Sequence, residues 1–87
     1  MYRILDYTLR KAKEMGLEVK PSTNAKKKLD VYQHGKKIAS IGAIGYSDYP
    51  HYILEKGKAY ADERRRLYHL RHKKDSLGER LALALLW

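Results

Sequence analysis

The feature that most constrains the fold is the segment Leu81–Trp87, in which every residue is apolar although 33% of the whole chain is charged. A helix that is apolar on all sides has no face for water, so its own domain or another molecule must cover it. Ser76 and Glu79 precede the segment with the spacing of a capping box, which predicts where the helix begins. We expect this helix to pack inside its own domain, and a self-association surface is the alternative.

The length of 87 residues fits one small domain with a single core, spanning 1–87. No cysteine is present, so disulfides and thiolate metal sites are excluded, and a reducing compartment suits the chain. The first residues carry charges where a signal peptide needs an apolar stretch, and no apolar run approaches the roughly 20 residues that span a bilayer. These features predict an intracellular protein, in the cytoplasm or nucleus, with no membrane partner.

The first half of the sequence predicts one helix and three strands. Apolar residues recur at spacings of three and four over 2–15, which is typical of an amphipathic helix. A short strand with alternating polarity follows at 17–19 and is expected to stop at Pro21. Two further strands flank His34 and Gly35, which can supply the positive φ that a tight hairpin turn demands.

The second half of the sequence predicts helices. Ser47 or Asp48 is expected to cap a short helix that reaches about Lys56, and 58–74 has the composition of a longer, very polar helix. The expected fold class is therefore α+β, with a three-stranded antiparallel β-meander packed against an N-terminal helix and two or three C-terminal helices.

The charge of the chain predicts an anionic partner. Lysine and arginine outnumber aspartate and glutamate by 19 to 10, which gives a net charge of +9. Like charges at this density repel one another across the folded surface, and phosphate backbones are the commonest counter-charge. Nucleic acid is therefore the expected partner, although basicity that serves only solubility is the alternative.

Two basic clusters lie near aromatic residues, a mixture that supplies phosphate contacts and stacking surfaces. One cluster is at the ends of the predicted hairpin, and the other is on the 58–74 helix. The residues expected to contact nucleic acid are Lys26, Lys27, Lys28, Tyr32, Lys36, Lys37, Arg64, Arg65, Tyr68, Arg71 and Lys74. Contacts to phosphates carry no base readout, so we expect binding that does not depend on nucleotide sequence.

The arginine run 64–66 also has a simpler interpretation, as the solvated face of an ordinary helix. Asp62 and Arg66 could form an i,i+4 ion pair on that face. Consecutive arginines spread over about 200° of a helical wheel, so one flat surface cannot use all three and some are expected to be bystanders.

The sequence predicts no catalytic site and no cofactor. Ser47, Asp48 and His51 could meet at a helix start, but Asp48 has a simpler role there as the cap. The segment 42–45 resembles a phosphate-binding loop only in its two glycines, because the following Lys-Ser/Thr is missing.

No metal site is predicted either. His69 and His72 are spaced to share one face of a helix, but a stable zinc site needs a third and usually a fourth ligand. The other available ligands are Asp62, Glu63 and the distant His34 and His51. Histidines beside arginines on a solvated helix are more often plain surface residues.

Tyrosines and the apolar end offer a second kind of function. Tyr46, Tyr49 and Tyr52 cluster around a helix start, and we expect them to pack the sheet against the helices rather than bind bases. The alternative function is a structural or host-factor-binding role through this cluster and the apolar helix. That protein interface would contain Leu83, Leu86 and Trp87.

A further signal comes from the segments 35–42, 46–50, 61–68, Arg71-His72 and Leu86-Trp87. Together these segments resemble a family of small basic proteins of unknown function that large DNA viruses encode. It implies a viral setting, in the host cytoplasm or nucleus or in the virion, and it supplies no activity or site residues. In that setting we favour DNA over RNA as the partner, while a viral or host protein partner and the choice between monomer and homodimer stay open.

Overall fold

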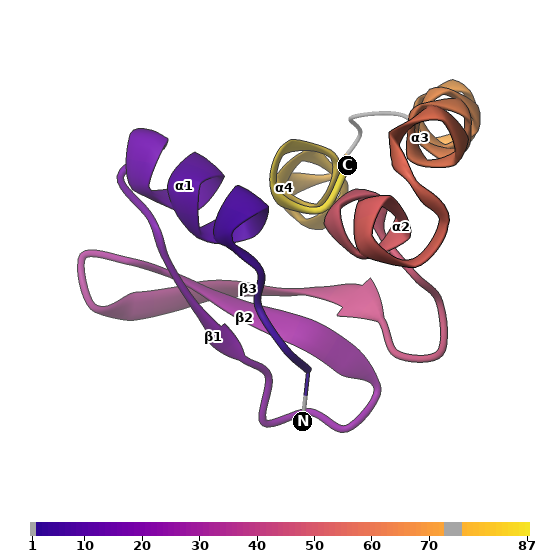
Figure 1. Cartoon of the computed structure of the whole chain (residues 1–87). Helices are drawn as coiled ribbons and strands as arrows, with labels where there is room; N and C mark the ends of the chain where they lie inside the picture. The colour runs from indigo at the N-terminus through magenta and orange to yellow at the C-terminus, as the bar shows by residue number, and fades with distance from the viewer. Residues whose placement is uncertain (1, 73–75) are drawn as a thin grey trace.

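The computed structural model describes residues 2–72 and 76–87 and has an α+β fold, as predicted. Its elements in chain order are α1 (Asp6–Glu14), β1 (Glu18–Pro21), β2 (Lys27–Gln33), β3 (Lys36–Ala43), α2 (Tyr49–Lys56), α3 (Lys58–Arg71) and α4 (Leu77–Leu85). The three strands form one antiparallel sheet in the order β1-β2-β3. Figure 1 shows the helices on one side of this sheet, with α4 between α1 and α2.

The hairpin between β2 and β3 confirms the predicted turn. His34 and Gly35 have φ values of 52° and 76°, and Gln33 pairs with Lys36 across them. Two successive residues with positive φ are the signature of the primed turn whose twist matches that of the flanking strands. The local sequence therefore determines this hairpin.

Three predicted element boundaries were wrong. Helix α1 begins at Asp6 instead of residue 2, because the preceding segment is extended and Tyr2 binds a distant carboxylate. Strand β1 reaches Pro21 instead of ending before it, because an edge strand tolerates a residue that has no N–H to donate. Helix α3 ends at Arg71, and the remainder of the predicted helix falls partly outside the described residues.

Two predicted helix caps are confirmed. The Asp48 side chain accepts a hydrogen bond from the backbone N–H of His51 at the start of α2. Ser76 accepts one from the N–H of Glu79 at the start of α4. These side chains satisfy backbone donors that the first helical turn leaves without a partner.

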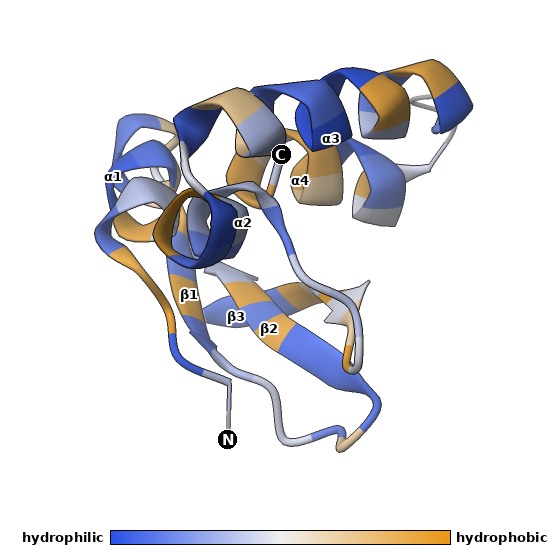
Figure 2. Ribbon diagram, turned by 45° about the vertical axis from the view of Figure 1, so that its right-hand side comes forward, coloured by the Kyte–Doolittle hydropathy of each residue, from blue (hydrophilic) through white to orange (hydrophobic). Residues whose placement is uncertain are grey.

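The apolar segment 81–87 forms the centre of the core, as expected for a helix without a polar face. Leu83, Leu86 and Trp87 are 4%, 1% and 7% exposed, and α4 is the most hydrophobic helix in Figure 2. Leu86 and Trp87 share one buried cluster with Leu29 and Val31 of β2. The three side chains proposed for a protein interface are therefore covered by the chain itself and do not form an exposed surface. None of the described helices is long and apolar enough to cross a membrane.

The backbone carbonyl groups of the last three residues of 81–87 accept hydrogen bonds from α1, α2 and α3. The Leu85 carbonyl accepts a hydrogen bond from the Thr8 hydroxyl of α1 at 2.8 Å. The Leu86 carbonyl accepts one from the N–H of Tyr49 in α2 at 3.0 Å, and the Trp87 carbonyl accepts one from Arg65 Nε of α3 at 2.6 Å. A helix end leaves such carbonyls without intrahelical partners, so these bonds both satisfy them and fix the helix arrangement.

We predict that Thr8→Val lowers the free energy of unfolding by about 1–3 kcal/mol, because valine keeps the shape of threonine but leaves the buried Leu85 carbonyl without its donor. Urea unfolding followed by circular dichroism measures this change. Thr23→Val is the matched control. Thr23 is exposed, and it donates a hydrogen bond to Asp30 through its backbone N–H, which valine keeps. Equal stability of the two variants would contradict the role of the Thr8 hydroxyl.

A second buried polar group, Asp30, stabilises the sheet. Its carboxylate accepts hydrogen bonds from Ser22 and Ser40, both at 2.7 Å, and from the N–H of Thr23 at 3.3 Å. The hydrogen bonds from Ser22 and Ser40 and the nearby charge of Lys37 lower the pKa of Asp30 to about 2. The ionised carboxylate thus holds the β1–β2 connection against β3.

The lowered pKa predicts a loss of stability in acid. A carboxylate whose pKa is lower in the folded protein stabilises it above its unfolded pKa, so this contribution disappears as the pH falls from about 4 to about 2. Asp30→Asn should lower the unfolding free energy by about 1–3 kcal/mol at pH 7 and by less near pH 2. Urea unfolding at both pH values measures the difference. Glu14→Gln, at an exposed position of α1, should change stability by less than about 0.5 kcal/mol at either pH.

Candidate nucleic-acid interface

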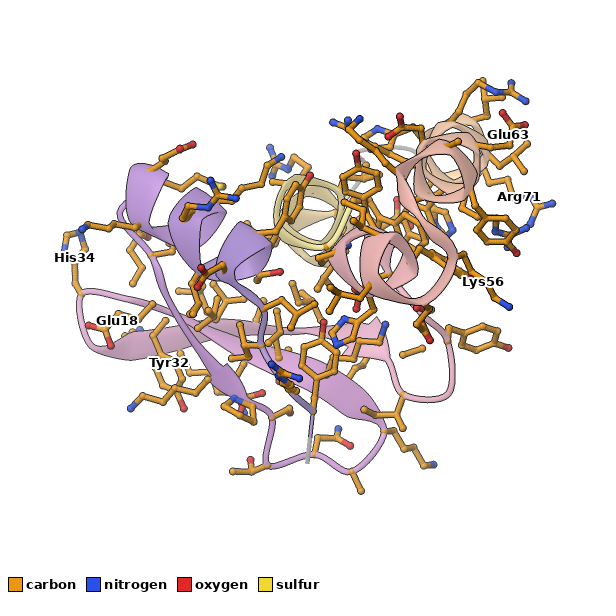
Figure 3. All side chains as sticks on the ribbon, viewed as in Figure 1. Glu18, Tyr32, His34, Lys56, Glu63 and Arg71 are labelled. Atoms are coloured by element: carbon orange, nitrogen blue, oxygen red, sulfur yellow. The ribbon has the colours of Figure 1, made fainter. Side chains whose placement is uncertain are left out.

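The hairpin lysines separate into two groups at opposite ends of the sheet. Lys27 pairs with Ala43, and the Lys26 carbonyl accepts a hydrogen bond from the N–H of Ile44, so both lie at the end where β3 leaves the sheet. Lys36 and Lys37 instead follow the hairpin turn. In Figure 3, His34 of that turn and Arg71 of α3 lie on opposite sides of the molecule. The predicted hairpin lysines therefore do not form one surface.

Tyr32 belongs to the end of the sheet that lies far from α3. It pairs with Lys37 across the strands, and the Lys20 ammonium lies 5.1 Å from the centre of its ring. Figure 3 shows Tyr32 on the same side as His34. An aromatic ring there cannot act together with the arginines of α3 on one short ligand.

Lys28 was expected on the surface and is instead buried. Its ammonium group lies 3.0 Å from Asp48 Oδ2, and the two side chains are 5% and 0% exposed. The neighbouring Lys26 and Lys27 are exposed. A run of three lysines gives no sequence signal for which one turns inward, since the buried position is set by the distant Asp48.

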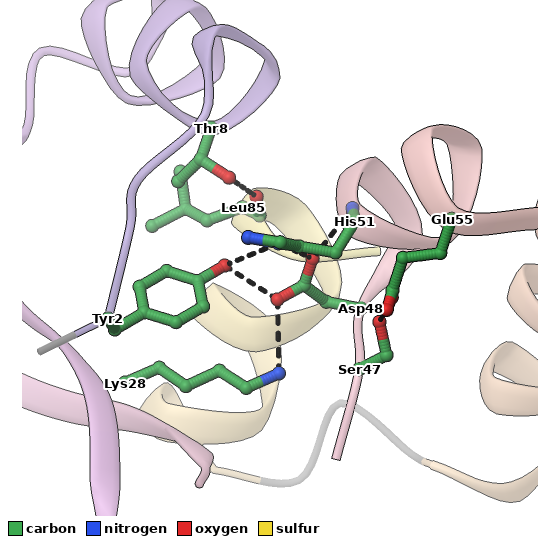
Figure 4. A network of polar contacts seen from close by, with 8 residues as sticks. All are labelled: Tyr2, Thr8, Lys28, Ser47, Asp48, His51, Glu55 and Leu85. Atoms are coloured by element: carbon green, nitrogen blue, oxygen red, sulfur yellow. Dashed lines mark hydrogen bonds and ion pairs between the residues drawn. The ribbon is translucent and has the colours of Figure 1, made fainter. Parts of the chain in front are cut away.

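Asp48 is the centre of a buried polar network (Figure 4). Tyr2 donates a hydrogen bond to its Oδ2 at 2.6 Å, and Nδ1 of His51 lies 2.7 Å from its Oδ1. Burial opposes ionisation, but the hydrogen bond from Tyr2 and the charge of Lys28 outweigh it and lower the pKa of Asp48. Burial and the bond to Asp48 raise the pKa of Tyr2. The network joins the N-terminal segment, β2 and α2.

The hydrogen bonds around Asp48 hold segments of the chain together and do not pair the Ser47 hydroxyl with His51 as its base. The Ser47 hydroxyl donates to Glu55 at 2.7 Å and lies on the other side of Asp48 from His51 in Figure 4. Both carboxylate oxygens of Asp48 already accept hydrogen bonds. Within residues 2–72 and 76–87, no three histidine, aspartate or glutamate side chains gather to hold a metal ion.

The arginines of α3 have different roles. Arg65 binds the Trp87 carbonyl and lies 5.1 Å from the centre of the Tyr49 ring, so it is a packing residue rather than a free surface charge. Arg66 pairs with Glu63 at 2.6 Å. The ion pair expected between Asp62 and Arg66 is replaced by one between Asp62 and Lys58 at 3.0 Å.

Arg64 and Arg71 line a groove between α3 and the segment that follows β3. The groove has a volume of about 350 Å³, and none of the lining residues that the structure describes is acidic. We call it the α3 groove and define it by Tyr46, Tyr52, Arg64, Tyr68, Arg71 and Trp87. Four residues of the predicted interface line it: Arg64, Tyr68, Arg71 and Lys28, whose ammonium group is engaged by Asp48. Lys74 lies outside the described residues.

Arg64 carries a buried donor that no group in 2–72 or 76–87 engages. Its Nε has no hydrogen-bond partner among the residues that the structure describes, and its guanidinium lies 5.8 Å from the centre of the Tyr52 ring. A buried polar group without a partner costs about 1–3 kcal/mol.

Tyr68 is part of a three-ring stack. Its ring centre lies 4.2 Å from that of Trp87 at an interplanar angle of 8°, and 3.9 Å from that of His72 at 19°. Two parallel rings at these distances would collide on one face, so Trp87 and His72 cover opposite faces of Tyr68. The expected stacking of Tyr68 on a base is therefore blocked in this arrangement.

Tyr46 is the aromatic residue of the α3 groove that stays open. It is 77% exposed, whereas Tyr49 is buried and Tyr52 is half-buried. The expected packing role thus holds for Tyr49 and Tyr52 but is wrong for Tyr46. Its position directly after Gly45 was the sequence signal for a loop residue, since Gly45 has a φ of 98° that takes the chain out of the sheet.

Gly42 positions the loop that carries Tyr46. Its φ is 78°, and a Cβ atom there would lie 2.9 Å from Cδ1 of Leu86 and 3.1 Å from Cβ of Lys28. A side chain at this position would therefore force β3 away from α4. The glycine lets one wall of the α3 groove pack directly on the core helix.

Comparison with known proteins gives no assignment, since no family model, no curated protein and no solved structure matches this chain. The site geometry is therefore the basis for proposing a function.

We predict that Lys28→Met lowers the free energy of unfolding by about 3 kcal/mol, because it leaves the ionised Asp48 buried without its positive partner. Lys27→Met removes the same charge at an exposed neighbour and should change stability by less than about 0.5 kcal/mol. Urea unfolding of both variants tests this difference. A Lys28 variant as stable as the Lys27 variant would rule out a structural role for the buried ion pair.

Proposed function

We propose that this protein binds nucleic acid through phosphate contacts, without catalysis and without reading the nucleotide sequence. The observation that carries the proposal is the α3 groove, which combines Arg64 and Arg71 with aromatic walls and has no acidic lining residue within 2–72 and 76–87. Phosphate oxygens are the acceptors that arginine recognises best, because the planar guanidinium can offer two parallel donors.

The charges around the α3 groove support a phosphate-binding surface. Lys26 and Lys27 are exposed and lie beside Ala43 and Ile44, at the edge from which Tyr46 extends. Arg71 has no ionic partner among the described side chains. Two arginines that line the groove and two lysines beside Ala43 and Ile44 can neutralise several phosphates, and the released counterions then drive association.

The lysines at the hairpin turn do not belong to this surface. Lys36 and Lys37 lie at the far end of the sheet, and Lys37 is 3.6 Å from the carboxylate of Asp30. They can attract a long polyanion from a distance but cannot contact a short one held in the α3 groove. The proposed phosphate contacts are therefore Lys26, Lys27, Arg64 and Arg71.

The proposal includes DNA as the preferred nucleic acid and an intracellular, viral setting. Both rest on the resemblance of 35–42, 46–50 and 61–68 to proteins of large DNA viruses. The groove itself does not select DNA, because phosphates are common to DNA and RNA.

We expect single-stranded or duplex DNA to bind with a salt dependence that several phosphate contacts produce. Fluorescence anisotropy from about 50 to about 300 mM salt should give a slope of log K against log salt near −4 for a duplex. Arg71→Gln should weaken binding about tenfold and reduce the magnitude of that slope by about 1.

Lys36→Gln is the matched control, because it removes the same charge far from the α3 groove, and it should weaken binding less than about twofold. Equal effects of the two substitutions would move the contact surface away from the groove. Absence of saturable binding to either form of DNA at the lowest salt would overturn the proposed function.

A further inference from the structure

We propose that the α3 groove holds one unpaired base, stacked on Tyr46, so that the nucleic acid bound there is single-stranded. This inference rests on the proposed function, because it specifies which form of nucleic acid the same groove takes. It names a base contact in addition to the phosphate contacts. Stacking of this kind tolerates any base, because each has a π face.

The size and lining of the groove favour a base over a duplex backbone. A volume of about 350 Å³ is in the range of sites that enclose a small ligand. In a duplex the bases are stacked inside, so a duplex would offer only phosphates and sugars to the rim and leave the aromatic walls unused. An unpaired base instead brings a flat apolar face into the groove.

The side chains of the groove match the parts of one nucleotide. Tyr46 offers a free ring face at the rim, in contrast to Tyr68, whose two faces are covered by Trp87 and His72. Arg64 and Arg71 line the same groove and supply two guanidinium charges. These charges match the phosphates that flank a base.

An acidic peptide would meet the same charges but use the groove less well. A carboxylate can bind arginine, but most acidic segments carry no flat ring to stack on Tyr46. The apolar walls at Tyr52 and Trp87 also favour a ligand with an aromatic body and anionic ends. The observations therefore favour an unpaired nucleotide.

The test compares strands that have the same phosphates but differ in their bases. A labelled thymidine oligonucleotide and an abasic strand of equal length are measured by fluorescence anisotropy at about 150 mM salt. We expect the thymidine strand to bind about tenfold tighter, which is a typical effect of one stacked base. A glutamate oligomer as competitor should displace neither strand at equal charge concentration.

Substitution of Tyr46 separates stacking from charge. Tyr46→Ala should reduce thymidine binding about tenfold, to the level of the abasic strand, and leave abasic binding unchanged. Tyr46→Phe should restore the difference, because phenylalanine keeps the ring. Tyr32→Ala is the matched control at the far end of the sheet and should have no effect. Tyr46 is 77% exposed, so its loss should not unfold the protein.

The outcomes distinguish the inference from the proposed function. Equal binding of thymidine and abasic strands, unaffected by Tyr46→Ala, would overturn base stacking and leave phosphate binding intact. Displacement of DNA by the glutamate oligomer would assign the groove to acidic peptides instead. Binding of neither strand would overturn both proposals. Quenching of the single Trp87 on addition of the thymidine strand would place the base at the groove, and an unchanged signal would argue against it.

Discussion

The fold depends on the three carbonyl groups at the end of the core helix. Leu85, Leu86 and Trp87 accept hydrogen bonds from α1, α2 and α3 respectively, so one short apolar segment fixes all the other helices. A helix end buried without partners would be strongly unfavourable, because each unsatisfied carbonyl carries a desolvation cost. The apolar side chains supply the burial, and the carbonyl bonds supply the geometry.

The same segment also builds the floor of the α3 groove. Trp87 is buried against Tyr68, and Leu86 lies against Gly42 at the end of β3. The groove wall on the sheet side and the wall on α3 are thus attached to one element of the core. A site with walls fixed in this way binds a ligand with little reorganisation, which reduces the entropy lost on binding.

Local patterns predicted the fold class, while contacts between distant residues decided the composition of the site. The hairpin turn at His34 and Gly35 and the caps at Asp48 and Ser76 could be read from neighbouring residues. The grouping of the lysines could not, because Lys28 turns inward to an aspartate twenty positions away. Tyr46 was expected to be a packing residue and is exposed. Gly45 signals a loop at this position but does not show which side chains the loop leaves uncovered.

The sequence by itself determined the kinds of element and their order, the hairpin turn, the helix caps and the need to bury 81–87. These depend on backbone preferences and on the spacing of apolar residues within a few positions. Only the tertiary structure decided which basic residues lie together. It separates Lys36 and Lys37 from α3, buries Lys28 and engages Arg65 in packing. It leaves Arg64 and Arg71 in a groove whose described lining residues include no acid. The physical reason is that the pairing of a charge depends on its neighbours in space, and those neighbours come from distant parts of the chain.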